Sequence, residues 1–226
     1  MNRMIMIDQG LNTNIYLGKN RRLLETSSLQ SYLVMDPDIN GSQMSQPFGQ
    51  IRSWEDALLL PGQVYIFKGV EEASLIVIPL TGNIANPLKP TEIIKVGELL
   101  LFPVQIGEEI SIVNPDDEKP VNLLLLKCTP LTLSQCVVMK IPGEENEQYP
   151  SQIKILIGEF EERKEYEYKV KRKSRNIFAY VLSGAFEVNN CLLSARDGLA
   201  ISRTKLLEME ALSNDAIILV VEMTEL

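Results

Sequence analysis

The 226 residues of this chain include no histidine. The side chains that are considered for chemistry are therefore its carboxylates, its lysines and its three cysteines. Without imidazole the chain cannot build a Ser-His or Cys-His nucleophile pair, a histidine general base or a histidine-rich metal site. Cys128, Cys136 and Cys191 are odd in number and form no Cys-x-x-Cys pair, so neither a disulfide framework nor a thiolate zinc site is predicted. These reaction classes are excluded.

The charge of the chain argues against a nucleic acid partner. The formal net charge is -8 at pH 7 and the sequence pI is 4.8, so a phosphate backbone would be repelled. The one basic run, Lys169 to Arg175, directly follows a glutamate-rich segment at 161–167. Mixed charge of this kind is typical of a solvated strand or turn.

Nothing in the sequence predicts a membrane partner. No stretch approaches the length of a membrane span, and the apolar run Met4 to Ile7 is too short for the hydrophobic region of a signal peptide. We therefore expect a cytoplasmic protein.

The elements that must position any site are strands. Short runs rich in β-branched and aliphatic residues recur between clusters of Gly, Pro, Asn and Asp, as they do in sandwiches and barrels. In the segment 165–170, Tyr166, Tyr168 and Val170 alternate with charged residues. A first series of strands is predicted at 64–67, 74–80, 92–96, 98–102, 109–113 and 121–128, and a second at 152–160, 165–170, 176–182, 185–188, 192–194, 198–202, 206–211 and 216–223.

The two series look like a duplication. Leu80-Thr81-Gly82 and Leu182-Ser183-Gly184 each stand between two aliphatic runs, and a later turn recurs as Val96-Gly97-Glu98 and Ala195-Arg196-Asp197. A period of this size is too long for a solenoid and fits a duplicated barrel domain. The β pattern is interrupted by Pro and Gly at 129–151, and the residues before about 47 are expected to precede the first barrel strand.

The first series also carries the spacing of a known signature. Gly62 is followed after five residues by Lys68 and then by Val70, Ser74 and Gly82, while Gly97 is followed after five residues by Pro103, with Gly107 and Asn114 in expected places. This succession resembles the cupin signature in its pirin variant. The segments 47–56 and 179–184 resemble those that lead into the first and second barrels of the pirin and quercetinase-like bicupins.

The resemblance implies an all-β bicupin fold with two jelly-roll-like β-barrel domains. Residues 1–130 would form an N-terminal cupin-like domain with a leading segment, 131–151 a linker, and 152–226 a C-terminal cupin-like domain.

The resemblance also shows where a metal site would be. In the family, histidines stand at the positions of Lys68 and Val70, an acidic residue commonly at Ser74, and a histidine and a glutamate at Ile110 and Ile112. Residues two apart on a strand share a face, so Lys68 and Val70 are expected to converge with Ile110 and Ile112 inside the first barrel. A protonated ammonium and aliphatic groups offer a metal no lone pair. We therefore expect neither a metal nor a cofactor.

A carboxylate site is the alternative way to hold a metal. With the spacing of ordinary cupins, Glu108 would take a ligand position, and Glu71 and Glu72 lie beside the first motif. Carboxylates alone suit Mg²⁺, Mn²⁺ or Ca²⁺ better than a dioxygenase metal. The competing interpretation is a solvated surface cluster.

Lys68 has two interpretations: an anion-binding group at the barrel mouth, or a side chain that extends to solvent from a degenerate site. Asn86 is either a polar wall of that pocket or part of an Asn-Pro turn. Trp54, Tyr65 and Tyr180 either line a cavity or belong to the core. If Lys68 faces inward, the emptied site is expected to be a mainly apolar cavity with one cation at its edge.

Two functions follow. The first is a non-catalytic bicupin that binds a small anionic or apolar ligand, or a protein partner, as the resemblance to pirin implies. The second is a metal-dependent oxidoreductase related to quercetin 2,3-dioxygenase, which needs redox-metal ligands that the sequence does not supply.

Overall fold

Both predicted series of strands are present in the computed structural model, which describes residues 13–36, 46–141, 150–170 and 175–224. Four predicted strands have the observed bounds, namely those at 109–113, 121–128, 185–188 and 206–211. The described residues contain one 3-10 turn, η1 (Gly18–Asn20), and no α-helix. No helix in these ranges has the length and apolar character that a membrane crossing needs.

The N-terminal half is built from two sheets. Its large sheet has the order β12-β9-β6-β11-β4-β3-β2 and its small sheet the order β5-β10-β7-β8. The strands are β2 (Arg22–Glu25), β3 (Leu29–Met35), β4 (Ile51–Leu59), β5 (Val64–Lys68), β6 (Ala73–Thr81), β7 (Ile84–Asn86), β8 (Lys89–Ile94), β9 (Glu98–Val104), β10 (Glu109–Val113), β11 (Val121–Cys128) and β12 (Val137–Lys140).

The C-terminal half repeats this plan. Its sheets have the orders β1-β18-β15-β20-β13 and β14-β19-β16-β17, so β13 to β20 take the places that β4 to β11 take in the first half. The strands are β1 (Thr13–Tyr16), β13 (Ile153–Phe160), β14 (Glu165–Lys169), β15 (Arg175–Ser183), β16 (Ala185–Val188), β17 (Cys191–Ser194), β18 (Gly198–Thr204), β19 (Leu206–Ala211) and β20 (Ala216–Thr224). The predicted all-β, two-barrel fold is confirmed.

The matching turns have matching backbone. Gly82 and Gly184 have φ angles of 72° and 73°, in the left-handed region that glycine adopts without steric cost. In the later turns, the side chains of Glu98 and Asp197 accept hydrogen bonds from the backbone N–H groups three residues earlier, at 2.9 Å in both cases. The equivalent turns of the two halves therefore have the same backbone conformation and the same hydrogen bond, as the duplication inferred from the sequence predicts.

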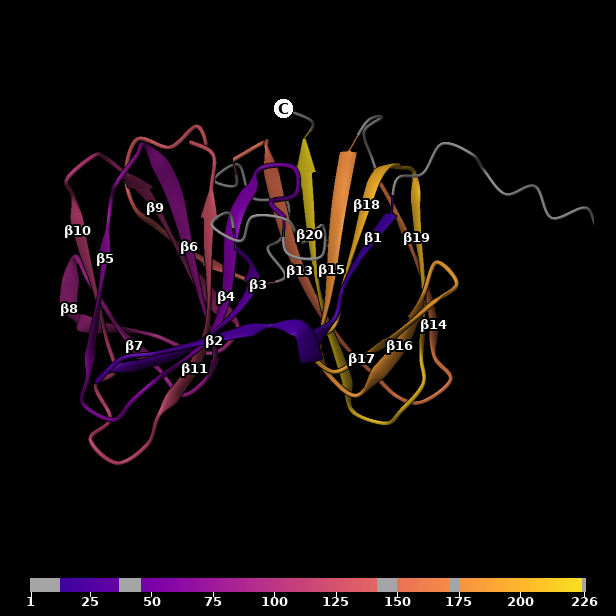
Figure 1. Cartoon of the computed structure of the whole chain (residues 1–226), viewed down its shortest axis with the longest axis horizontal. Helices are drawn as coiled ribbons and strands as arrows, with labels where there is room; N and C mark the ends of the chain where they lie inside the picture. The colour runs from indigo at the N-terminus through magenta and orange to yellow at the C-terminus, as the bar shows by residue number, and fades with distance from the viewer. Residues whose placement is uncertain (1–12, 37–45, 142–149, 171–174, 225–226) are drawn as a thin grey trace, which may run out of the picture.

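The expectation that the residues before about 47 precede the first barrel strand is wrong. Strands β2 and β3 extend the large N-terminal sheet beyond β4, and β1 pairs with β18 of the other half. In Figure 1 the indigo strand β1 accordingly lies among the orange strands. Within the predicted linker, β12 pairs with β9. The division at 130 and 151 stays a prediction, and β1 crosses it.

The large sheets of the two halves pack face to face and form the central core between them (Figure 1). On β6, Ile76 and Ile78 enter this central core, whereas Leu75 and Val77 enter the N-terminal barrel. A strand buried on both faces needs a continuous apolar run, which is what the sequence shows there. In addition to this shared central core, each barrel encloses a separate hydrophobic core.

Aromatic side chains join the two halves. Trp54 of β4 lies 4.9 Å from Phe178 and 5.1 Å from Tyr180 of β15, measured between ring centroids, and all three are fully buried. Tyr65 packs against the core of the N-terminal barrel. Trp54 and Tyr180 are thus core residues, as one of the two interpretations predicted.

A buried carboxylate completes this contact. Asp56 Oδ2 lies 2.7 Å from Arg21 Nη1 and 3.1 Å from Arg196 Nη1, and it accepts a hydrogen bond of 3.2 Å from the Tyr180 hydroxyl. Asp56 Oδ1 accepts another, of 2.9 Å, from Asn122. Arg196 has a φ of 70°, and its turn takes the place of the Gly97 turn in the first half. Arg196 thus brings a guanidinium of the C-terminal half to Asp56 of the N-terminal half.

Candidate functional site

The N-terminal barrel opens at a cavity of about 210 Å³ between β4 and β5, with β2 and β3 beside it. Six ionisable side chains line this N-terminal cavity together with apolar ones. The charged members are Arg22, Asp36, Glu55, Lys68, Glu71 and Lys127, and the apolar members include Leu24, Leu33, Met35, Phe67, Val70 and Ala73. The lining therefore differs from the expected apolar cavity with a single cation.

Strand alternation places two of these charges inside the barrel. Lys127 is in phase with Leu123 and Leu125 of β11, which belong to the barrel core, and it lies opposite Ser53 in the register of β4. Glu55 is two residues further along β4 and shares that face. The side chain of Lys127 is only 17% exposed, and its ammonium lies 3.1 Å from the Glu71 carboxylate.

The environment of Glu55 favours its neutral form. Burial raises the pKa of the Glu55 carboxyl, while a hydrogen bond of 2.5 Å from the Ser31 hydroxyl opposes the shift. The charge of Asp36 raises this pKa further, and that of Lys127 lowers it. Burial, and secondarily the charge of Glu55, raises the pKa of the Tyr65 hydroxyl. The Glu55 carboxyl therefore keeps its proton to a higher pH than an ordinary glutamate does.

Lys68 and Val70 lie at the rim and do not face inward, so the expected convergence with Ile110 and Ile112 is wrong, and Lys68 extends to solvent as its second interpretation held. The alternation of β5 directs Tyr65 and Phe67 into the barrel and Lys68 outward. The Lys68 side chain is 69% exposed, and its ammonium lies 2.9 Å from Glu109 on the neighbouring strand. Val70 is 77% exposed. Because β5 ends at Lys68, the two-residue period does not continue to Val70.

Ile110 and Ile112 do face inward, as expected. Both are buried in the core of the N-terminal barrel, opposite Phe67 and Tyr65 in the strand register. The four inward positions on this pair of strands therefore hold two aromatic and two aliphatic side chains. Lys68 and Val70 do not converge with the isoleucines.

Ser74 and Asn86 have structural contacts elsewhere. Ser74 faces the other half of the molecule, and its hydroxyl accepts a hydrogen bond of 3.0 Å from the backbone N–H of Leu131. Asn86 is buried at the end of β7, where its carbonyl oxygen accepts a hydrogen bond of 3.0 Å from Leu88 N–H and its amide donates to Glu92. Asn86 belongs to the turn and does not line the N-terminal cavity.

The donor set does not fit a transition metal. The inward groups are Glu55, Lys127 and hydroxyls, and the chain has no imidazole to add. The carboxylates proposed as an alternative are engaged separately, since Glu71 pairs with Lys127 and Glu108 accepts from Gln105 N–H. Within the described ranges, no three His, Cys, Asp or Glu side chains are arranged to hold a metal ion.

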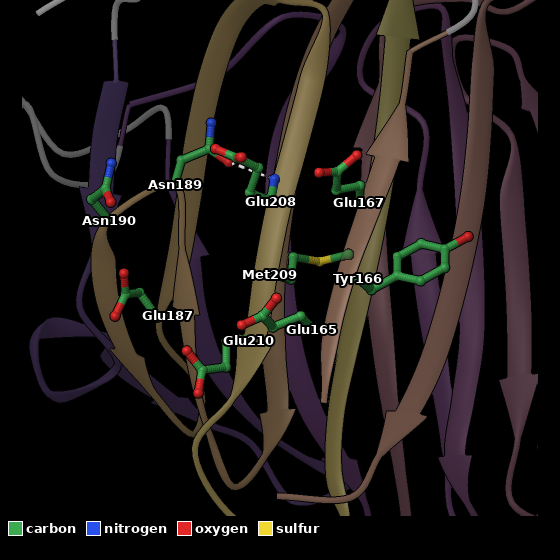
Figure 2. A pocket seen from close by; sticks show the side chains of 9 residues that line it. All are labelled: Glu165, Tyr166, Glu167, Glu187, Asn189, Asn190, Glu208, Met209 and Glu210. Carbon is green, nitrogen blue, oxygen red and sulfur yellow. Dashed lines mark hydrogen bonds between the residues drawn. The ribbon is translucent and has the colours of Figure 1, made fainter. Parts of the chain in front are cut away.

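Glutamates also gather on the outer face of the small C-terminal sheet, around a hollow of about 230 Å³. Glu165 lies opposite Glu210, and Glu167 opposite Glu208, in the register of β14 and β19. Figure 2 shows these carboxylates spread across the sheet and not directed to one point. The arrangement is an acidic surface and lacks the geometry of a cation site.

Glu55 and Lys127 were missed by the sequence reasoning. One signal could have found Lys127, because it is the only charged residue in the run 121–128 and keeps the phase of Leu123 and Leu125. Glu55 has no comparable signal, because β4 carries polar residues on both of its faces, with Ser53 and Glu55 on one and Asp56 on the other. The basic run Lys169 to Arg175 lies mostly outside the described residues.

Comparisons with known proteins agree with this fold. The family model described as the quercetinase C-terminal cupin domain matches residues 148–223. Bacterial pirin YhhW from Escherichia coli, solved with nickel(II), superposes with a TM-score of 0.78 at 14% identity, over 95% of this chain and 100% of that one. Quercetin 2,3-dioxygenase from Acinetobacter baumannii gives 0.68 at 11% identity, over 95% and 79%. No curated protein matches the chain.

The chain therefore has a bicupin fold, with two barrels joined through their large sheets. Its fold is that of the pirin and quercetinase-like cupins, and its C-terminal barrel matches the quercetinase C-terminal domain family.

Proposed function

We propose that this protein is a pirin-like bicupin that binds a small polar ligand in the N-terminal cavity and does not perform metal-dependent oxygenation. One observation carries the proposal: the charged groups inside the barrel are Glu55 and Lys127, in a chain that has no histidine. Lys127 can donate charge-assisted hydrogen bonds to an anionic group of the ligand. Lys68 and Val70 at the rim are proposed as secondary contacts.

The alternative is an oxidoreductase related to quercetin 2,3-dioxygenase. The similarity to that enzyme extends over the fold, at 11% identity. Its redox chemistry would need a metal, for which Ile110 and Ile112 supply no ligands. A regulatory role through a protein partner is compatible with the binding proposal. The three free cysteines fit a reducing compartment, so we also propose a cytoplasmic location.

Metal analysis separates the two classes of function. The purified full chain is dialysed against chelator, then incubated with iron, copper or nickel and dialysed again. We expect no stoichiometric metal and no oxygen consumption with quercetin. One tightly held equivalent per chain together with turnover would establish the oxidoreductase and refute the proposal.

The binding part of the proposal is tested by thermal shift with a panel of small carboxylates and phosphates. Wild type is compared with Lys127→Met, which keeps the aliphatic stem and removes the charge. Loss of a charge-assisted hydrogen bond is expected to weaken anionic hits by about tenfold or more. Lys89→Met is the control, because Lys89 also forms an ion pair with a glutamate but lies on β8, outside the cavity, with its side chain 67% exposed. Equal stabilisation of all three proteins would remove Lys127 from the site.

A further inference from the structure

The duplication gives the N-terminal cavity a counterpart in the other barrel. Since β13 and β14 take the places of β4 and β5, the corresponding opening of the C-terminal barrel lies between β13 and β14. A cavity of about 380 Å³ occupies that place. This C-terminal cavity falls in the size range of small-molecule sites.

Sheet topology explains why this cavity is open. Both β13 and β14 are edge strands of their sheets. In the N-terminal half, β3 and β2 extend the large sheet past β4, and residues of both line the cavity. Within the described part of the chain, no strand extends the large C-terminal sheet past β13. The C-terminal cavity therefore has room at its entrance for a ligand.

The walls of the C-terminal cavity are apolar and aromatic. Leu156 and Phe160 of β13 form one side, Tyr166 and Tyr168 of β14 the other, and Val220 of β20 lies deeper. Tyr166 is 51% exposed and lies against Phe160, with ring centroids 6.1 Å apart. Aromatic rings prefer offset or edge-to-face partners at such separations, so a planar ring can be accommodated between these walls.

Among the residues that the structure describes, Lys154 is the only charged one that lines this cavity. Ile153 and Ile155 belong to the central core, so strand alternation turns Lys154 into the barrel. Its ammonium lies 5.8 Å from the centre of the Tyr168 ring. Within the described ranges, no carboxylate lies at ion-pair distance from it.

The nearest carboxylate across the strand register is already engaged. Glu222 lies opposite Lys154 on β20 and is buried. Its carboxylate accepts a hydrogen bond of 2.5 Å from the Tyr168 hydroxyl. This bond fixes the Tyr168 ring as a wall of the cavity, below the Lys154 ammonium. The ammonium is thus held at an apolar surface with its donors available to a ligand anion.

We infer that the C-terminal cavity is a second ligand site, which binds a small aromatic carboxylate. The aromatic ring lies between the walls formed by β13 and β14, and the carboxylate accepts hydrogen bonds from Lys154. The two barrels then bind ligands at equivalent positions but with different chemistry. The N-terminal cavity is polar, whereas the C-terminal cavity is apolar and carries the Lys154 ammonium.

Calorimetric titration of the full chain with naphthoate tests the inference, with naphthamide as the uncharged analogue. We expect naphthoate to bind at one site and naphthamide about tenfold more weakly. Lys154→Met should weaken naphthoate by about tenfold and leave naphthamide unchanged. Leu156→Trp should fill the cavity and abolish binding of both, and its melting curve shows whether it folds.

The control is Lys89→Met, which removes a lysine that lines neither cavity and should leave naphthoate affinity as in wild type. Loss of naphthoate binding in Lys127→Met, with none in Lys154→Met, would assign the ligand to the first barrel and overturn the inference. Equal affinity for naphthoate and naphthamide, or no binding of either to wild type, would also overturn it. Neither result bears on metal binding, so the proposed function is judged separately.

Discussion

The contact between the two halves should depend on the charge of Asp56. Its side chain is 6% exposed, and those of Arg21 and Arg196 are 15% and 29% exposed. Asp56→Asn keeps the size of the side chain but leaves both guanidinium groups without their carboxylate. Breaking a buried ion pair costs about 3 to 5 kcal/mol, and since water reaches both arginines, we expect the lower end, about 3 kcal/mol.

The single tryptophan of the chain reports this effect directly. Trp54 precedes Asp56 by two residues and is buried against Tyr180 of the other half, so its fluorescence changes when the halves separate. Urea unfolding followed by this signal should show the loss in unfolding free energy. The melting temperature should fall by roughly 6 to 12 °C, at about 2 to 4 °C per kcal/mol for a chain of this size.

An exposed ion pair of similar length provides the matched control. Lys68 and Glu109 lie 2.9 Å apart, but their side chains are 69% and 55% exposed. Glu109→Gln should therefore change stability by at most about 1 kcal/mol. If Asp56→Asn costs no more than Glu109→Gln, the Asp56 cluster does not stabilise the contact between the halves and the reasoning from burial is refuted.

Two further predictions follow from raised pKa values. Because burial raises the pKa of Glu55, the native state binds more protons than the unfolded chain between the ordinary and the raised value, so this residue's contribution to stability falls as pH rises through that window. Glu55→Gln should remove this loss, so urea unfolding at a series of pH values from about pH 4 upward should show the variant gaining stability relative to wild type, and parallel curves would contradict this. Burial also raises the pKa of the Cys128 thiol to about 12 and that of Cys136 to about 11, so iodoacetamide near pH 8 should label these two sites only slowly until denaturant is added. Rapid labelling of Cys128 in the native protein, detected by peptide mass, would contradict its burial.

Local sequence patterns were sufficient for most of the strands and for the duplication, although β3 and β4 were not predicted. Apolar runs bounded by turn residues gave most strands to within two residues, because side-chain alternation and turn chemistry act over a few neighbours. The two Leu-(Thr/Ser)-Gly turns were recognisable because their φ angles of 72° and 73° suit glycine. Short edge strands such as β2 and β12 were missed, since exposed strands of four residues carry little apolar pattern.

The candidate site was predicted only in part. Ile110 and Ile112 lie inside the first barrel as expected, because both belong to one regular strand. The predicted inward direction was wrong for Lys68 because the alternation of β5 directs Tyr65 and Phe67 inward and Lys68 outward, and it was wrong for Val70 because β5 ends at Lys68. A signature counted from Gly62 gives position along the chain and not the direction of a side chain.

The sequence by itself determined that the chain is all-β and duplicated, and that no imidazole is available to any site. Only the tertiary structure decided that Glu55 and Lys127 meet inside one barrel, because their strands are far apart in the sequence and their faces depend on the register of β4 and β11. It also decided that β1 joins the C-terminal sheet and that Lys154 lines an open apolar cavity. These contacts form between residues that are far apart in the sequence, so no short segment of the chain contains the interactions that determine them.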